Sequence, residues 1–119
     1  MVKLIICATR RSDISREEFD SYWREKHGPL VKSVAEFARH VRKYVQCHLV
    51  EGTAPFGIAG DYDGVAELWF DDMEALLKAR QSLEWKASSA DEENFIDHTK
   101  VAYFVSEEHI ILDKVRHER

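Results

Sequence analysis

His27 is the residue whose type and position point most directly to chemistry. It lies in the segment FDSYWREKHGPLV (residues 19–31), on the apolar stripe of a helical pattern and directly before Gly28 and Pro29. An imidazole has an ordinary pKa of ~6.5, which suits general acid–base work near neutral pH. The break at Gly28 and Pro29 would loosen the helix packing beside His27 and open a pocket. The position also fits a core histidine bonded to a carbonyl that is freed at the bend, so both interpretations stay open.

His48 is a second candidate for proton transfer. It shares one face of the strand-like segment KYVQCHLV (residues 43–50) with Tyr44 and Gln46. A polar row of this kind more often faces solvent than a catalytic site. Here we expect the row to line a cleft, because the opposite row is the more natural core and consists of Val45, Cys47 and Leu49.

Glu67 is the odd acid in the apolar segment VAELWF (residues 65–70). Because a carboxylate buried without a partner is costly, we expect Glu67 to be paired or to lie on an exposed rim. A pairing with His27 or His48 would create an acid–base dyad. Glu67 and the two histidines are therefore the candidate catalytic residues.

Aromatic residues are numerous enough to wall a cavity for a flat, apolar ligand. Any single one of them is more often simply a core residue. The candidate substrate-binding residues are Tyr22, Trp23, Tyr44, Trp69, Phe95 and Phe104.

No motif points to a metal, a nucleotide or a nucleophilic serine. The six histidines show neither H-x-x-x-H nor H-x-H spacing, and the two cysteines lie 40 positions apart. We therefore expect no cofactor, neither a transition metal nor a flavin. Cys7 and Cys47 are interpreted as buried free thiols in a reducing compartment, with a disulfide as the minor alternative.

The composition is typical of one acidic domain. The 119 residues are 45% hydrophobic and 33% charged, with a formal net charge of −5. Because Lys and Arg do not cluster, we expect neither a nucleic-acid nor a membrane partner. No apolar run approaches the roughly 20 residues that span a bilayer, and the N-terminal apolar stretch is too short for a signal peptide. The expected location is the cytoplasm.

The periodicity of apolar residues predicts the secondary structure. Alternating or β-branched runs predict strands at 2–9, 43–50, 65–70 and 100–105. Steps of three and four predict one bent helix, or two nearly collinear ones, from about 15 to 41, with a Ser15–Glu18 capping box. A second helix is predicted over 71–86. The remaining predictions are a loop at 51–64, a loop with a short helical turn at 88–98, an edge strand at 109–112 and a flexible tail at 113–119.

The element order β-α-β-β-α-β predicts one α+β domain over residues 1–119 with a ferredoxin-like fold, an antiparallel sheet with both helices on one face. The strands carry large apolar residues on both faces, and two helices cover only one. An open apolar face of that size is unusual for a monomer. We therefore expect a homodimer in which a second copy covers the open face.

Four stretches together resemble the EthD family across nearly the whole chain. They are FxxYWxxxHGPL (residues 19–30), YVQxH (44–48), YDGVAELWF (62–70) and FIDHTKVAYFVSEE (95–108). The resemblance implies a dimeric α/β barrel, in which two ferredoxin-like subunits bring their sheets face to face. It also favours a functional His27, because this histidine recurs in the family motif. Relatives in that group include cofactor-free isomerases, cyclases, dehydratases, monooxygenases and some haem-binding enzymes, so it implies the reaction only loosely.

The leading hypothesis is a cofactor-independent enzyme of the isomerase or lyase type. It would isomerise, dehydrate or cyclise a lactone or an aromatic, polyketide-like carbonyl compound, with His27 as general acid and base. One alternative is a cofactor-free monooxygenase of phenols. Another is a non-catalytic carrier of hydrophobic metabolites or haem. The substrate, the reaction direction and the pathway stay open at this stage.

Overall fold

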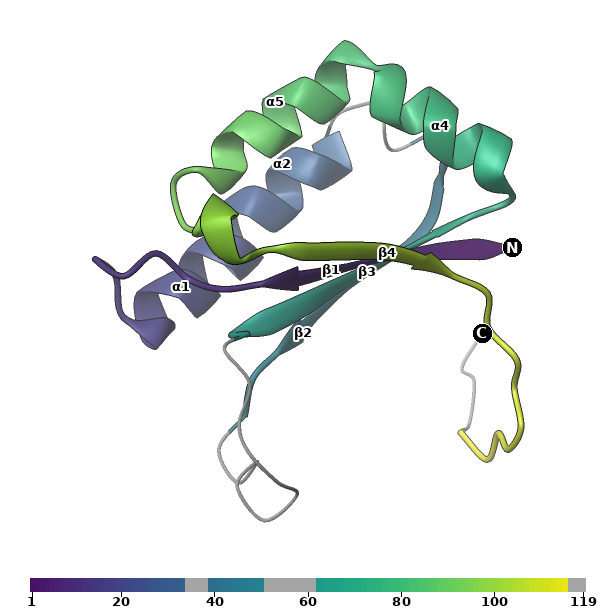
Figure 1. Cartoon of the computed structure of the whole chain (residues 1–119), viewed down its shortest axis with the longest axis horizontal. Helices are drawn as coiled ribbons and strands as arrows, with labels where there is room; N and C mark the ends of the chain where they lie inside the picture. The colour runs from purple at the N-terminus through teal and green to yellow at the C-terminus, as the bar shows by residue number, and fades with distance from the viewer. Residues whose placement is uncertain (34–38, 51–61, 116–119) are drawn as a thin grey trace.

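A four-stranded sheet covered on one side by helices forms the body of the molecule. The structure is a computed structural model and describes residues 1–33, 39–50 and 62–115. The strands are β1 (Val2–Ala8), β2 (Val41–His48), β3 (Gly64–Phe70) and β4 (Ala102–Ser106). The longer helices lie together on one side of the sheet (Figure 1). The helical segments are α1 (Arg16–Tyr22), the π-helical η1 (Trp23–His27), α2 (Gly28–Ser33), α4 (Met73–Gln81), α5 (Leu83–Glu92) and the 3-10 helix η3 (His98–Lys100).

The strands pair in the order β2-β3-β1-β4, and every pair is antiparallel. With the order β-α-β-β-α-β, this confirms the predicted ferredoxin-like fold. The central strand β3 alternates strictly between buried and half-buried residues, and β1 does so from Lys3 onward. Their register is fixed because a slip of one residue would turn the buried row away from the helices. That row packs against Phe19, Trp23 and Phe95 of the helical side.

The first helical region runs through Gly28 and Pro29 instead of breaking there. Ser15 and Glu18 form the predicted capping box at the start of α1. Five residues, Trp23 to His27, then form a π-helical turn, and the Gly28 N–H donates to the Trp23 carbonyl. A proline cannot donate the helical hydrogen bond and crowds the preceding turn, and the wider π turn relieves this conflict. The predicted bend is therefore a π turn. The prediction of a helix up to about residue 41 was wrong at its end, because residues 39–40 form a turn. Residues 34–38 lie outside the described part of the chain.

The second helical region is longer than predicted. α4 ends at Gln81, and Ser82 caps a separate helix, α5, by accepting a hydrogen bond from the Trp85 N–H at 3.1 Å. The prediction of a loop over 88–98 was wrong for its first part, because α5 continues to Glu92. The segment is rich in Ser, Ala and acidic residues, and its polarity concealed the helix.

The other face of the sheet is left open by the residues that the structure describes. It carries the half-buried residues of β1 and β3, and Phe104 of β4 opposes Ile5 on it. Cys7 and Cys47 both stand opposite Val65 in the register and therefore share this face. Both thiols are free, but Cys7 is half-buried and Cys47 exposed, so the prediction of two buried cysteines was wrong for the single chain.

The segment after β4 leaves the body of the molecule. The predicted edge strand at 109–112 is absent, since residues 107–115 contain no strand. Ile110, Ile111 and Leu112 are instead exposed, and the segment extends beyond the open face (Figure 1). Within the described ranges, none of the helices has the length and hydrophobicity needed to cross a membrane.

Candidate functional site

His27 is buried between the helices and the sheet, where it is paired with a carboxylate. Only 5% of its surface is exposed. Its Nδ1 lies 2.9 Å from Oδ2 of Asp91, which comes from α5. The ring of Phe95 packs on the imidazole with 5.0 Å between centroids. The side chain is thus fixed at one nitrogen and on one ring face.

Asp91 is itself held by two further hydrogen bonds. The Tyr22 hydroxyl donates to Oδ1 at 2.7 Å, and the Asn94 amide donates to the same oxygen at 3.1 Å. Burial acts to raise the pKa of Asp91, but the hydrogen bonds from Tyr22, His27 and Asn94 outweigh it and the pKa is lowered. Asp91 therefore stays ionised at neutral pH and can only accept hydrogen bonds.

An ionised Asp91 determines which proton His27 carries. Because the carboxylate only accepts, the Nδ1 of His27 must be the donor, and the neutral ring then has its lone pair on Nε2. Burial lowers the pKa of His27, and the hydrogen bond and the charge of Asp91 only partly oppose it. The neutral form thus predominates at neutral pH. None of the described residues bonds to Nε2, so this nitrogen is available as a base.

His27 lines a small inner cavity of about 40 Å³. Trp23, Tyr44, Trp85 and Glu92 contribute the other aromatic or polar walls, and the sheet contributes Ile6, Ala8, Ala66 and Leu68. Such a volume holds a group about the size of one or two water molecules rather than a ring. Burial raises the pKa of Tyr44, so its hydroxyl keeps its proton.

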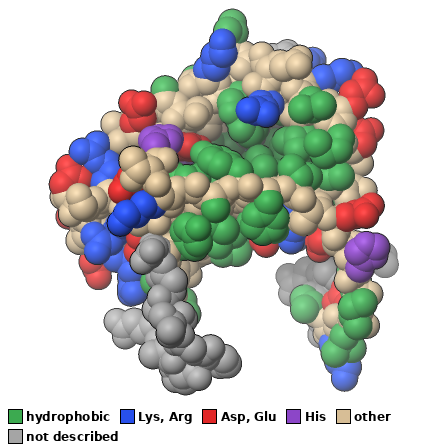
Figure 2. All heavy atoms as spheres, in the orientation of Figure 1, with side chains coloured by type: hydrophobic (Ala, Val, Ile, Leu, Met, Phe, Trp, Pro, Cys, Tyr) green, Lys and Arg blue, Asp and Glu red, His purple; other side chains and the backbone are tan. Residues whose placement is uncertain are grey.

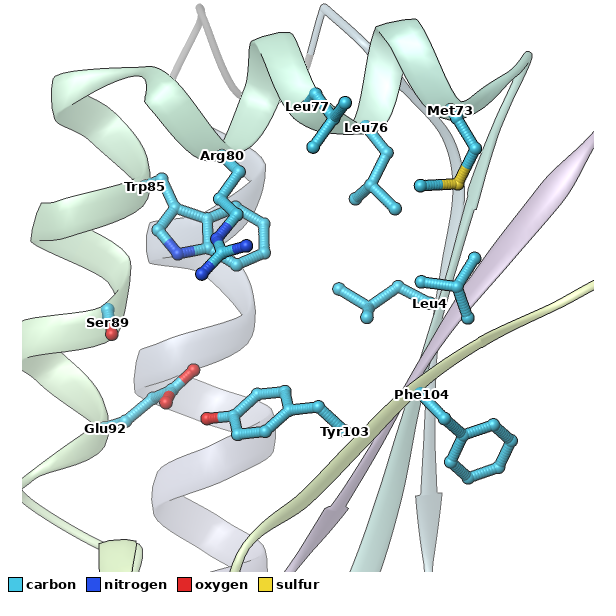
Figure 3. A pocket seen from close by; sticks show the side chains of 11 residues that line it. Leu4, Met73, Leu76, Leu77, Arg80, Trp85, Ser89, Glu92, Tyr103 and Phe104 are labelled. Carbon is cyan, nitrogen blue, oxygen red and sulfur yellow. The ribbon is translucent and has the colours of Figure 1, made fainter.

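A larger outer pocket of about 450 Å³ lies between α4, α5 and β4. Figure 2 shows hydrophobic side chains gathered around this hollow, above β4. Trp85 and Glu92 line both the inner cavity and the outer pocket, so these two residues form their common wall. In Figure 3 the Glu92 carboxyl group and the Tyr103 hydroxyl point toward one another across the pocket.

Glu92 differs from the neighbouring Asp91. Burial, and secondly the charge of Asp91, raise the pKa of Glu92 to about 7. No described residue bonds to its carboxyl group. A large fraction of Glu92 is therefore protonated at neutral pH, next to an aspartate that is not.

The position of Trp23 in the inner cavity depends on an unusually close approach of β3 to η1. A Cβ on Gly64, the first residue of β3, would lie 2.4 Å from the Trp23 ring. Gln46 reaches from β2 to donate to the Trp23 carbonyl at 2.8 Å, the same carbonyl that receives the Gly28 N–H in the π turn. Gly64 and Gln46 thus position η1, and with it His27.

His48 lies on the helix side of the sheet, in the polar row predicted to line a cleft. Its Nδ1 is 2.9 Å from Asp20 and its Nε2 is 2.8 Å from Gln46. It stacks on Trp23 at 4.4 Å between centroids and does not line the inner cavity. Both of its nitrogens are occupied, unlike those of His27. The opposite row, including Val45 and Cys47, lies on the open face, so the expectation that it forms the chain's own core was wrong.

Glu67 stands apart from both histidines. It lies on the open face and pairs with Lys3 at 3.3 Å. The predicted dyad of Glu67 with His27 or His48 is therefore not formed, because the sheet separates the carboxylate from both rings. The expectation that Glu67 is paired or at a rim holds.

The six predicted aromatic residues divide into three groups. Trp23 and Tyr44 line the inner cavity. Tyr22 and Phe95 contact Asp91 and His27 from outside the cavity. Trp69 and Phe104 lie on the open side of the sheet, and Phe104 also borders the outer pocket. The assignment of Trp69 to the same site was wrong, because alternate residues of a strand face opposite sides.

Sequence reasoning missed Asp91 and Glu92. A signal was present, since Trp85, Ser88, Glu92 and Phe95 follow the three-and-four spacing of a helix face. That spacing places Glu92 on an inward stripe. The pairing of Asp91 with His27 spans 64 positions and has no local signal.

Comparison with solved structures supports the fold. The chain matches an EthD family protein from Bacillus halodurans with 27% identity and a TM-score of 0.70, covering 92% of this chain and 99% of that one. A dimeric protein of unknown function and ferredoxin-like fold from Bacteroides fragilis matches with 14% identity and a TM-score of 0.66, covering 89% and 94%. A hydroxynitrile lyase from Passiflora edulis matches with 12% identity and a TM-score of 0.69, covering 94% and 96%.

Comparison by sequence identifies the family. No relative was found among curated proteins. The EthD domain matches residues 11–99, which include His27, the π turn around it, Gly64 and the Asp91–Glu92 pair. With the β-α-β-β-α-β order and the Bacillus halodurans structure, this match agrees with the motifs that resembled the family. The chain belongs to the EthD family.

Proposed function

We propose that this protein is a cofactor-independent enzyme that moves a proton within a small, largely apolar carbonyl compound. The observation that carries the proposal is the state of His27, which is buried at a cavity and held at Nδ1 by Asp91, and whose Nε2 has no partner among the described residues. A positioned acid–base group of this kind contributes about 10²–10⁴-fold to a reaction rate.

The proposed step begins with His27 as base. Nε2 takes a proton from the carbon beside the substrate carbonyl, the C–H electron pair forms a C=C bond, and the carbonyl π electrons move to oxygen. Asp91 stabilises the imidazolium that forms. Return of the proton to another carbon completes an isomerisation, and its delivery to a departing hydroxyl completes a dehydration with loss of water. Attack of the enolate carbon on a second carbonyl, whose oxygen then takes the proton, closes a ring.

The fold is compatible with such chemistry. The lyase from Passiflora edulis shares it, although 12% identity carries over the architecture and not the reaction. The carrier hypothesis shares the same pocket, and the oxygenase hypothesis adds only molecular oxygen. The proton-transfer proposal is preferred because a carrier needs no oriented His–Asp pair beside its ligand.

Deuterium exchange tests the proposal without knowledge of the natural substrate. 2-Acetylnaphthalene is a flat, apolar ketone whose methyl hydrogens exchange in D₂O through an enolate. We expect the protein to accelerate this exchange, measured by loss of the methyl NMR signal. His27→Gln should slow it by about 10²-fold or more and leave the affinity for the ketone nearly unchanged. The matched control, His98→Gln, changes an exposed histidine and should exchange like the unmodified protein.

The alternatives give different results. Equal exchange by the protein and by His27→Gln would show that His27 is structural. Tight binding of 2-acetylnaphthalene without exchange above the buffer rate would favour a carrier. Oxygen uptake with 1-naphthol, lost in His27→Gln, would favour the oxygenase.

We also propose that the functional unit is a homodimer joined at the open face. Phe104, Val65 and Trp69 place large apolar side chains on that face, beside the Lys3–Glu67 pair, and they are only partly buried in the single chain. The Bacteroides fragilis protein of the same fold is dimeric, which supports the proposal. The inner cavity lies on the opposite side of the sheet, so a second copy would cover the open face without blocking it.

A further inference from the structure

Among the residues that the structure describes, Glu92 is the only acidic residue that lines both the inner cavity and the outer pocket. It is the last residue of α5, and with Trp85 it separates the inner cavity from the outer pocket. Its side chain is half-buried, and the described residues provide its carboxyl group with neither a hydrogen bond nor an ion pair. A carboxyl group placed in this way is suited to bond to a ligand.

Two adjacent carboxyl groups therefore have opposite properties. Asp91 receives three hydrogen bonds and is ionised. Glu92 receives none and faces apolar walls. Neighbouring titratable groups whose environments separate their protonation states in this way are the arrangement that acid–base enzymes use to assign an acid and a base.

We propose that Glu92 is the second proton-transfer residue of the site, which donates its proton to the substrate oxygen while His27 takes one from the adjacent carbon. This inference rests on the proposed function of His27. It adds a catalytic acid to that function and restricts the substrates that fit.

The protons transferred in this step balance between His27 and Glu92. The C–H proton moves to Nε2 of His27, the electron pair becomes the enol C=C bond, and the Glu92 O–H proton forms the enol O–H bond. The product of the step is a neutral enol, an imidazolium and a glutamate. In the second half the glutamate recovers the enol proton and the imidazolium protonates carbon, which restores both residues.

The sizes of the two cavities indicate the class of substrate. The inner cavity of about 40 Å³ admits a carbonyl group and one neighbouring carbon, whereas the outer pocket of about 450 Å³ admits a fused-ring body. Leu76, Leu77 and Met73 make one side of that pocket apolar (Figure 3). The preferred substrate is thus a flat, apolar molecule with a small carbonyl group at one end, which passes Glu92 to reach His27.

The titratable groups around Glu92 come from every element packed against it. They are His27 of η1, Tyr44 of β2, Tyr103 of β4, Arg80 of α4 and the adjacent Asp91. Burial and the charge of Glu92 raise the pKa of both Tyr44 and Tyr103, so neither tyrosine titrates near neutral pH. Within this set Glu92 changes charge around pH 7, and His27, whose pKa is lowered by burial, changes charge below its ordinary value of 6.5.

The test is the pH dependence of exchange into 2-acetylnaphthalene. Catalysis requires neutral His27 and protonated Glu92, so the rate should rise with pH as His27 loses its proton and fall again around pH 7. Glu92→Gln should lower the maximal rate about 10-fold or more and abolish the fall at alkaline pH. The dissociation constant for the ketone, measured by tryptophan fluorescence, should change less than threefold.

Two companion variants keep the test decisive. Glu93→Gln removes the exposed neighbouring carboxylate and should reproduce the unmodified rate and pH profile. Glu92→Asp retains a carboxylic acid and should therefore retain the decrease of the exchange rate at alkaline pH. This variant also tests the proposal if Glu92→Gln does not fold. An unchanged rate and profile in Glu92→Gln, while His27→Gln remains inactive, would overturn the role of Glu92 alone. Exchange that is independent of His27 would overturn the proposed function itself.

Discussion

At the scale of single residues, the comparison of His27 with His48 explains what makes a histidine available for chemistry. Each has Nδ1 at 2.9 Å from a carboxylate oxygen. The Nε2 of His48 is occupied by Gln46, whereas no described residue occupies the Nε2 of His27. Pairing with an acid orients a histidine, but only a free second nitrogen at a cavity makes it a base.

Asp91→Asn should reduce catalysis without removing His27. The amide no longer stabilises the imidazolium, and a hydrogen bond to a charged group is worth about 1.5–3 kcal/mol. The rate of ketone exchange should therefore fall about 10- to 100-fold. Tyr22→Phe, which removes one of the hydrogen bonds to Asp91, should have a smaller effect. A rate equal to that of the unmodified protein in Asp91→Asn would contradict the role of the pair.

His27 and Glu92 should make stability depend on pH in opposite directions. The folded pKa of His27 is lowered, so its contribution is present above about pH 6.5 and is lost as the pH falls below it. The folded pKa of Glu92 is raised from 4.5 to about 7, so its contribution is present below pH 4.5 and is lost as the pH rises through 7.

Glu92→Gln isolates the second effect. Above pH 7 the variant should be more stable than the unmodified protein by up to about 3 kcal/mol, since one pKa unit corresponds to about 1.36 kcal/mol. The difference should vanish near pH 4.5. Urea denaturation at several pH values measures it. A difference that does not vary with pH would mean that the Glu92 carboxyl group is not desolvated.

At the scale of elements, the contact between β3 and the π turn positions the site. Gly64→Ala would place a methyl group 2.4 Å from the Trp23 ring, and overpacking of this kind costs about 1–3 kcal/mol. We expect this loss in thermal or urea denaturation, together with slower ketone exchange. Gly28→Ala is the matched control, because its methyl group would meet the flexible end of Gln46 at 3.1 Å and the Trp23 carbonyl oxygen at 3.4 Å, an ordinary van der Waals distance. Equal stabilities of the two variants would contradict the close packing of Gly64 against the Trp23 ring.

The elements themselves were largely predictable from the sequence, and the site was not. The four strands and the Ser15 cap follow from alternation and from one capping motif, which are local signals. Whether Pro29 ends a helix or widens it to a π turn depends on a partner for the Trp23 carbonyl, and Gln46 supplies this from another strand. The Asp91 partner of His27 likewise comes from a distant helix. The face of β2 was misjudged because the apolar row of Val45 and Cys47 faces away from the chain's own helices.

At the scale of the whole molecule, the open face determines the expected assembly. Val65 lies on this face toward the start of β3, between Cys7 and Cys47 in the strand register. Val65→Lys should leave the helix-side core intact and yield a folded monomer, because the charge would be desolvated only in the dimer. Sedimentation velocity at micromolar concentration measures the change. A stable monomer of the unmodified protein would contradict the proposed dimer.

The two cysteines on the open face have a consequence for how the protein responds to oxidation. Each is one strand away from Val65, so their backbones are separated by two interstrand spacings, about 10 Å. That separation exceeds the roughly 7 Å limit for a disulfide, and the chain therefore cannot close a bridge between its own thiols. Burial raises the pKa of the Cys47 thiol, so it is a poor nucleophile as well. In the proposed dimer, the facing sheets would protect these sulfurs, and oxidative damage at them would mark molecules whose sheets had separated.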